Sequence, residues 1–278
     1  MRIGFHMSIY GSVDKAVDRA LEIGCNTLQI FTRNPRGWRA RPLRDEEVEA
    51  FIAKVERNDV RPVFSHMPYL SNLASPKDDI YAKSIETLIV ELERCMCLKI
   101  PYLVTHLGSH LGYGAKFGLK RIVEAIDRAF STSGEKVMLL LENTAGTRNS
   151  VGGSFKDIQY IIEHSAYSDK IGVCFDTCHA FAAGYDLRTE EAIEETIKGL
   201  EEAVGFGRVK LVHLNDSRGD LNSRIDRHEH IGLGRIGEKG FRSILRSRFA
   251  SLPLILETPK NSLRSDLENL MRIKRLLG

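Results

Sequence analysis

Short apolar runs alternate with longer amphipathic stretches along the whole chain. The short runs have the length and the apolar, β-branched content of strands that are covered on both faces. A helix pattern follows in residues 45–58, because Val48, Phe51 and Val55 recur at the spacing that places side chains on one helix face. The eight predicted strands cover residues 2–6, 27–31, 62–66, 102–106, 137–142, 172–176, 209–213 and 253–257.

The repeated strand–helix order predicts an α/β fold with a parallel sheet inside and helices outside. Eight such pairs in 278 residues fit a closed (β/α)8 TIM barrel, which usually has about 250 residues. We therefore expect a single domain spanning residues 1–278, with its active site at the C-terminal rim of the strands; an open, doubly wound sheet fits the same pattern. Residues 214–237 form an irregular connection far longer than the usual loop of about 2–6 residues, which indicates a functional loop.

Composition changes this picture little. The chain is 42% hydrophobic and 28% charged, as in a soluble globular protein, and its formal net charge of +3 is too small to indicate a polyanionic partner. The five cysteines are an odd number in a long chain, which favours reduced thiols and a cytoplasmic location. No apolar leader and no run of roughly 18 apolar residues is present, so we expect no membrane association.

Candidate chemistry lies where the predicted strands end. Seven of the eight strands finish in a histidine, an aspartate or a glutamate; we leave His6 unassigned as a ligand and take the other six as candidate ligands. In a barrel these ends meet on one rim, and carboxylates brought so close repel one another unless a cation lies between them. The pattern therefore predicts a metal site. The six residues are His66, His106, Glu142, Asp176, His213 and Glu257.

Three further donors follow closely, because His179 comes soon after Asp176, and the long loop contains Asp226 and His228. Each of these residues alone is more typical of a hydrogen-bonded rim residue or a helix cap, and the joint pattern favours metal binding. Nine donors are too many for one ion with about four or five ligands, so we expect two or three ions. Imidazole with carboxylate favours zinc, with manganese, iron or cobalt as alternatives.

Sequence motifs extend this pattern over the whole chain. They include "GFHMSIYGS" near the start, "SHMPYLSNLASP" (65–76), "LENTAG" (141–146), "GVCFDTCHAFAAGYD" (172–186) and "DRHEHIGLGRIG" (226–237). In order and spacing these motifs resemble the endonuclease IV family of apurinic/apyrimidinic endonucleases, which has a xylose-isomerase-like TIM barrel. The resemblance implies a trinuclear zinc centre, with Mn²⁺ as an alternative to Zn²⁺ in one position.

The resemblance also assigns the donors to individual ions. Glu142 would bridge two ions, and Glu142 with Glu257 would be catalytic because they orient the attacking water. The implied ligand sets are His66, His106 and Glu142 for the first ion, Glu142, Asp176, His213 and Glu257 for the second, and His179, Asp226 and His228 for the third.

By the same resemblance, we expect a monomeric DNA repair enzyme that hydrolyses the phosphodiester bond on the 5′ side of an abasic site in double-stranded DNA. The products would be a 3′-hydroxyl and a 5′-deoxyribose phosphate, and blocked 3′ ends would also be cleaned. Arg36, Tyr69 and Leu70 match the residues that enter the DNA at the lesion, whereas Gly37 replaces a longer polar side chain. Candidate phosphate contacts are Arg33, Arg148, Arg224, Arg227 and Arg235.

Two other functions fit parts of the pattern. A sugar isomerase or epimerase on the same barrel would use a quartet such as Glu142, Asp176, His213 and Glu257 around one or two ions, but it has no use for the other five donors. A non-catalytic DNA-binding or metal-storage protein leaves the gathering of donors at one rim unexplained.

Overall fold

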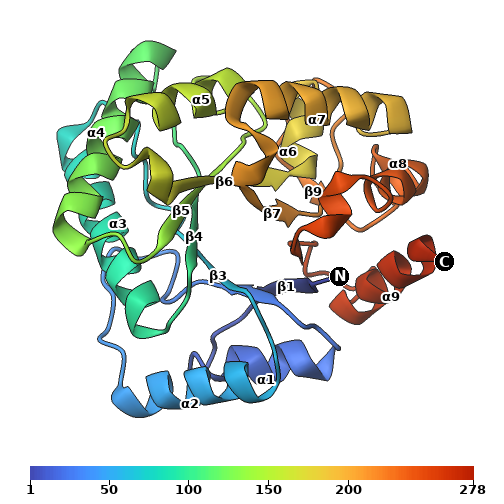
Figure 1. The fold of residues 1–278 in the computed structure, drawn as a ribbon, viewed down its shortest axis with the longest axis horizontal. Coiled ribbons are helices and arrows are strands. Elements are labelled where there is room, and N and C mark those ends of the chain that lie inside the picture. The colour runs from blue at the N-terminus through green and yellow to red at the C-terminus, as the bar shows by residue number, and fades with distance from the viewer.

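The computed structural model describes residues 1–278, which form a closed parallel barrel surrounded by helices (Figure 1). The hydrogen-bonded order is β1-β10-β7-β6-β5-β4-β3-β2, and β2 pairs back onto β1. The TIM barrel predicted from the sequence is confirmed. Its strands are β1 (Ile3–Met7), β2 (Leu28–Ile30), β3 (Val63–His66), β4 (Tyr102–Thr105), β5 (Met138–Glu142), β6 (Ile171–Asp176), β7 (Val209–His213) and β10 (Leu254–Leu256).

Amphipathic helices cover the outside of the barrel (Figure 1). Their apolar faces and the outward faces of the strands form one core of 62 buried residues. Such a core is the main source of stability in this architecture. The helices are α1 (Lys15–Glu22), α2 (Asp45–Arg57), α3 (Asp78–Cys97), α4 (Ala115–Ser133), α5 (Phe155–His164), α6 (Thr177–Ala183), α7 (Glu190–Val204), α8 (Gly237–Ile244) and α9 (Asp266–Leu277).

A second, smaller core fills the inside of the barrel. Six strands contribute one residue each to it, namely Phe64, Val104, Leu140, Cys174, Leu211 and Ile255. Side chains alternate between the two faces of a strand, so the residue two positions further along also points into the barrel. In all six strands that residue is one of the predicted metal donors. The strand period therefore turns every strand-end donor toward the same mouth of the barrel.

The long connection between β7 and α8 is more ordered than the sequence indicated. It contains two short strands, β8 (Asp216–Ser217) and β9 (His228–Glu229), which pair antiparallel. Strands of two residues are too short to give a periodic pattern, so the sequence could not predict them. No helix in the structure combines the length and the apolar character that crossing a membrane requires.

Candidate metal centre and active site

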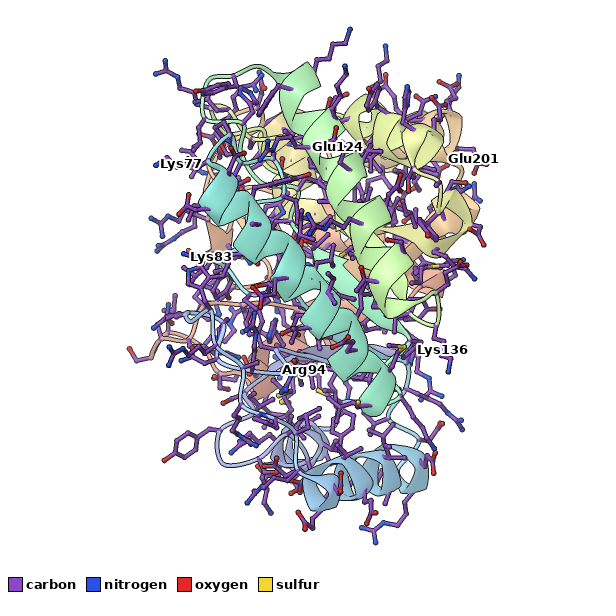
Figure 2. The ribbon with its side chains drawn as sticks, turned by 90° about the vertical axis from the view of Figure 1, so that its left-hand side faces the viewer. Lys77, Lys83, Arg94, Glu124, Lys136 and Glu201 are labelled. Atoms are coloured by element: carbon purple, nitrogen blue, oxygen red, sulfur yellow. The ribbon has the colours of Figure 1, made fainter.

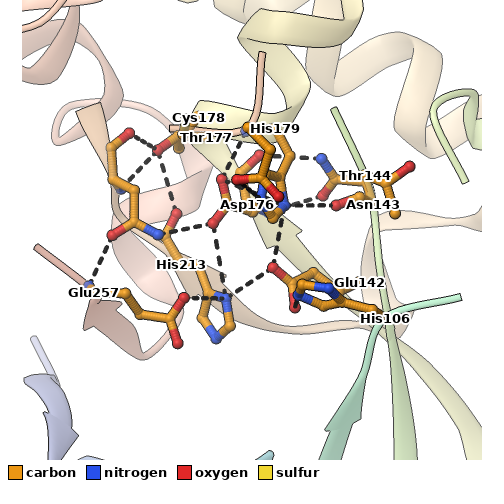
Figure 3. A network of polar contacts seen from close by, with 12 residues as sticks. His106, Glu142, Asn143, Thr144, Asp176, Thr177, Cys178, His179, His213 and Glu257 are labelled. Carbon is orange, nitrogen blue, oxygen red and sulfur yellow. Dashed lines mark hydrogen bonds and ion pairs between the residues drawn. The ribbon is translucent and has the colours of Figure 1, made fainter. Parts of the chain in front are cut away.

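All nine donors predicted from the sequence come together at the carboxyl ends of the strands. Figure 3 labels six of them, His106, Glu142, Asp176, His179, His213 and Glu257. They form three groups, and within each group the ligand atoms lie within 4.8 Å of one another. Glu142 belongs to two of the groups. The groups are His66, His106 and Glu142; Glu142, Asp176, His213 and Glu257; and His179, Asp226 and His228.

Glu142 lies at the centre of the cluster, at the end of β5. Its Oε2 atom is 3.2 Å from His66 Nε2 and 3.1 Å from His106 Nε2, and its Oε1 atom is 3.2 Å from His213 Nδ1. Complete burial opposes the charged form of this carboxyl group, but the imidazoles of His106 and His213 outweigh burial and hold the pKa of Glu142 well below its ordinary value. The site thus stabilises a buried carboxylate, as a cation-binding centre requires.

Three imidazoles are oriented by the backbone in the way that metal ligands usually are. The Nδ1 atoms of His66, His179 and His228 lie 2.7, 3.0 and 3.1 Å from the carbonyl oxygens of Met67, Asn143 and Glu257. Since a carbonyl oxygen only accepts, Nδ1 carries a proton, and in the neutral ring Nε2 is the nitrogen that offers a lone pair to a metal. His228 Nε2 is buried and has no hydrogen-bond partner. This orphaned atom and the free lone pairs fit a bound divalent ion.

Gln29 and His6 complete the layer of inward-facing polar residues. These two residues pair across β1 and β2. Gln29 Oε1 accepts from His213 Nε2 at 2.8 Å, which makes Nδ1 the nitrogen that offers a lone pair when the ring is neutral, and Gln29 Nε2 donates to Glu257 Oε1 at 2.7 Å. His6 Nδ1 lies 3.0 Å from the same Glu257 oxygen. The sequence analysis missed Gln29, whose only signal is an amide within an apolar strand.

Two asparagines fix Asp176 at the end of β6 (Figure 3). Asn215 Nδ2 donates to Asp176 Oδ2 at 2.7 Å, and Asn143 Oδ1 accepts from the Asp176 backbone N–H at 2.7 Å. Asp176 also caps helix α6, because its Oδ1 accepts from the N–H of His179 at 2.8 Å. The strand therefore passes directly into a helix whose first turn places His179 beside the cluster.

Cys174 and Cys178 also lie close to the donors. Both are buried, and burial raises the pKa of each thiol to about 12. The sequence analysis assigned both residues to apolar packing, and Cys174 belongs to the inner core of the barrel.

Asp216 anchors the long loop that contains Asp226 and His228. Its fully buried carboxylate accepts backbone N–H groups from Gly232 at 2.9 Å, Gly234 at 3.0 Å and Ile236 at 3.1 Å. A Cβ atom at Gly234 would lie 2.5 Å from Asp216 Oδ1, so only glycine allows this close approach. Sequence reasoning missed Asp216 because an aspartate in an irregular loop gives no periodic signal.

We expect Asp216→Ala to loosen this loop without unfolding the barrel. Removing the acceptor leaves several loop N–H groups without a partner, so hydrogen exchange of Gly232 to Ile236 should accelerate about 10- to 100-fold. Hydrogen-exchange mass spectrometry measures the effect. Arg227→Ala, an exposed position in the same loop without an ion pair, is the control and should leave these rates unchanged. Equal acceleration in both variants would show that Asp216 is no anchor.

Two adjoining cavities of about 340 and 350 Å³ lie over the donors and share five lining residues. One of these is Tyr69, whose ring packs edge-on against Phe31 at 5.0 Å. Tyr69 is 62% exposed, Leu70 is 39% exposed and Arg36 is exposed on the neighbouring loop. The Tyr69 N–H donates to the Pro35 carbonyl at 3.2 Å and so joins the two loops. All three proposed wedge residues are therefore accessible at the rim.

Gly37 lies beside Arg36 in the loop after β2. A Cβ atom there would meet nothing within 4 Å, and no positive φ is required. The position therefore leaves open space where the resemblance implies a longer polar side chain.

The candidate phosphate contacts differ in exposure. Arg33 is a buried side chain that pairs with Glu91, so it is not an exposed loop arginine. Arg148 and Arg227 are exposed and form no ion pair. Arg224 donates to the Gly146 carbonyl, and Arg235 pairs with Asp220.

Comparisons with known proteins place this geometry in a family. A family model described as xylose isomerase-like TIM barrel matches residues 17–275. The probable endonuclease 4 of Methanoculleus marisnigri is 53% identical over 278 residues, which covers 99% of each chain. The crystal structure of endonuclease IV from Thermus thermophilus superposes with a TM-score of 0.87 at 37% identity, covering 99% of this chain and 97% of the other.

The chain belongs to the endonuclease IV family. The family resemblance stated from the sequence motifs is confirmed, and the chain is an endonuclease. A D-tagatose 3-epimerase-like protein also superposes with a TM-score of 0.74, covering 100% of this chain and 97% of the other, but at 18% identity this likeness shows the fold alone. The endonuclease IV family and the sugar epimerases thus share a barrel, and the rim of the barrel must distinguish them.

Proposed function

We propose that this endonuclease hydrolyses the phosphodiester bond on the 5′ side of an abasic site in double-stranded DNA, leaving a 3′-hydroxyl and a 5′-deoxyribose phosphate. We also propose that it cleans blocked 3′ ends, and that residues 1–278 act as one domain. The observation that carries the proposal is the set of three donor groups under two adjoining cavities, with Glu142 shared between two of the groups.

The nine donors would hold three zinc ions, one in each group. When bound, divalent ions lower the pKa of water and neutralise charge on a phosphodiester. The donor set suits zinc because it combines imidazole nitrogens with carboxylate oxygens, and manganese accepts the same atoms in one position. A sugar epimerase of this fold needs only one such group, which leaves the other two without a use.

Glu142 and Glu257 are the proposed catalytic residues. Both carboxylates approach His213 Nδ1, at 3.2 Å and 3.5 Å. From there they can accept hydrogen bonds from an attacking water and orient it toward a phosphodiester in the cleft. Gln29 and His6 hold Glu257 in this position, so its role depends on a precise orientation as well as on its charge.

Arg36, Tyr69 and Leu70 are the proposed DNA contacts. Their exposure at the mouth of the cavities lets them enter the duplex where a base is missing and stabilise the extruded sugar. The lack of a base makes this extrusion less costly at an abasic site than at an intact pair. Selectivity for the lesion would therefore come from the rim, and bond cleavage from the donors below it.

We expect Tyr69→Ala to weaken binding of abasic DNA by about 1 to 3 kcal/mol, because the ring no longer stacks in the gap. Binding of an intact duplex should change little, since no gap is filled there. Fluorescence anisotropy with the two duplexes measures both affinities. An equal loss on both would show that Tyr69 contacts DNA without recognising the lesion.

The experiment that tests the proposed function compares three substrates. Purified enzyme should nick a duplex with a tetrahydrofuran abasic analogue, leave the intact duplex uncut and leave a free ketose unchanged. Gel analysis of the end-labelled strand identifies the 3′-hydroxyl. Epimerisation of the sugar without cleavage of either duplex would overturn the proposal in favour of a sugar epimerase.

A further inference from the structure

Another polar cavity, separate from the two over the donors, lies between the loop after β1 and the loop after β2. Its volume is about 360 Å³, and none of the nine donors lines it. None of its ten lining residues is acidic. Four of the ten are arginines, namely Arg33, Arg39, Arg41 and Arg94.

Arg33, which lines this cavity, has an unsatisfied donor. Its side chain is only 3% exposed. Arg33 Nη1 donates to the Trp38 carbonyl at 2.7 Å, and Nε lies 2.8 Å from Glu91 Oε1 as an ion pair. Nη2 is buried and has no hydrogen-bond partner. Because a guanidinium does not lose its proton in proteins, this nitrogen requires an acceptor that the chain does not supply.

The buried charges around the cavity are also unequal. Arg94, in the last turn of α3, is buried and donates only to neutral oxygens, those of Thr32 and the Arg41 carbonyl (Figure 2). Glu91 is therefore the one buried carboxylate opposite two buried guanidinium groups, Arg33 and Arg94. One buried positive charge remains without a counter-charge, which is costly in a protein interior.

The two outer arginines differ in what they already bind. Arg41 forms two hydrogen bonds with Glu47, both at 2.7 Å. Arg39 is exposed and forms no ion pair, so its guanidinium is free to close over an occupant. The cavity thus combines one buried excess cation with one free surface cation.

From this arrangement we infer that the cavity binds an oxyanion of the phosphate class. Guanidinium groups present paired N–H donors whose spacing matches two oxygens of a phosphate. The oxyanion would accept from Arg33 Nη2 and neutralise the excess charge. It is supplied either by inorganic phosphate or by a backbone phosphate of bound DNA. This site is separate from the metal centre and goes beyond the proposed function.

Occupancy would stabilise the loop that holds Arg36. Asn34 lines the cavity, and Pro35 accepts the hydrogen bond from the Tyr69 N–H. An anion between the two loops would therefore link them to α3 and fix the rim on that side. By fixing the loop that holds Arg36, the bound anion would assist DNA binding without itself contacting the lesion.

The test titrates inorganic phosphate into the full-length, metal-loaded enzyme at constant ionic strength and follows the melting temperature. Arg33→Lys keeps a charge opposite Glu91 but removes Nη2, and Arg39→Ala removes the free cation. Arg57→Ala, an exposed arginine of α2 without an ion pair, is the control. Phosphate bound at the metal centre would act equally on all four proteins, so only a difference between variants reports this cavity.

We expect phosphate to stabilise the wild type and Arg57→Ala saturably, and the half-saturating concentration to rise about tenfold in Arg33→Lys and Arg39→Ala. In phosphate-free buffer, affinity for a duplex is measured against salt concentration. If the occupant is a backbone phosphate of DNA, added inorganic phosphate should change the melting temperature equally in all four proteins. Both cavity variants should then bind the duplex more weakly, and the slope of log affinity against log salt concentration should be smaller by about one. If both variants match the wild type in both measurements, the inference is overturned.

Discussion

We expect Glu142→Gln to reduce the rate of phosphodiester cleavage by about 10³-fold or more while the barrel stays folded. Glu142 belongs to two donor groups, so the loss of one negative charge weakens both at once. The amide keeps the shape of the side chain, so the packing around position 142 is retained. Single-turnover nicking of an abasic duplex measures the rate, and elemental analysis of the same sample should show a loss of metal.

Glu124→Gln is the matched control for this prediction. It is the same substitution at an exposed position of α4 that forms no ion pair (Figure 2). The control should keep its full rate and metal content. A Glu142→Gln enzyme with normal metal content and a normal rate would remove Glu142 from the proposed mechanism.

Glu91→Ala should have the largest effect on stability, a loss of about 3–5 kcal/mol in the free energy of unfolding. The substitution leaves the buried guanidinium groups of Arg33 and Arg94 without their only buried carboxylate and leaves a cavity in its place. Burial raises the pKa of Glu91, which means that burying its charged form costs free energy. The guanidinium groups of Arg33 and Arg94 offset this cost. Equilibrium unfolding in urea measures the change.

Glu93→Ala is the control on the same helix. Glu93 is exposed and forms no ion pair, so we expect a change of about 0.5 kcal/mol or less. Similar losses in the two variants would mean that helix propensity, and not the buried charges, determines the effect at position 91.

The sequence predicted the barrel and the six strand-end donors because both follow from periodic patterns. Apolar runs alternating with amphipathic stretches specify strands and helices, and the strand period of two turns each terminal donor toward the mouth. Glu142 illustrates the point, since it lies two residues after the buried Leu140 and points the same way. Local spacing alone is sufficient for such residues.

Residues whose role depends on a partner far away in the chain could not be predicted. Gln29 is recognisable only once His213 lies opposite it across the barrel. Asp216 anchors a loop through backbone groups that no side-chain pattern reveals. Arg33 resembled an exposed arginine because the sequence does not show that this loop residue pairs with Glu91 of α3 in the interior. Each case requires tertiary contacts that periodicity does not encode.

The most direct test of this account is the zinc content of the fully active enzyme, measured by elemental analysis of purified protein. Three donor groups predict about three zinc ions per chain, in parallel with the capacity to nick abasic DNA. A preparation that cleaves abasic DNA at its full rate with one ion or none per chain would contradict the trinuclear centre and the mechanism built on it.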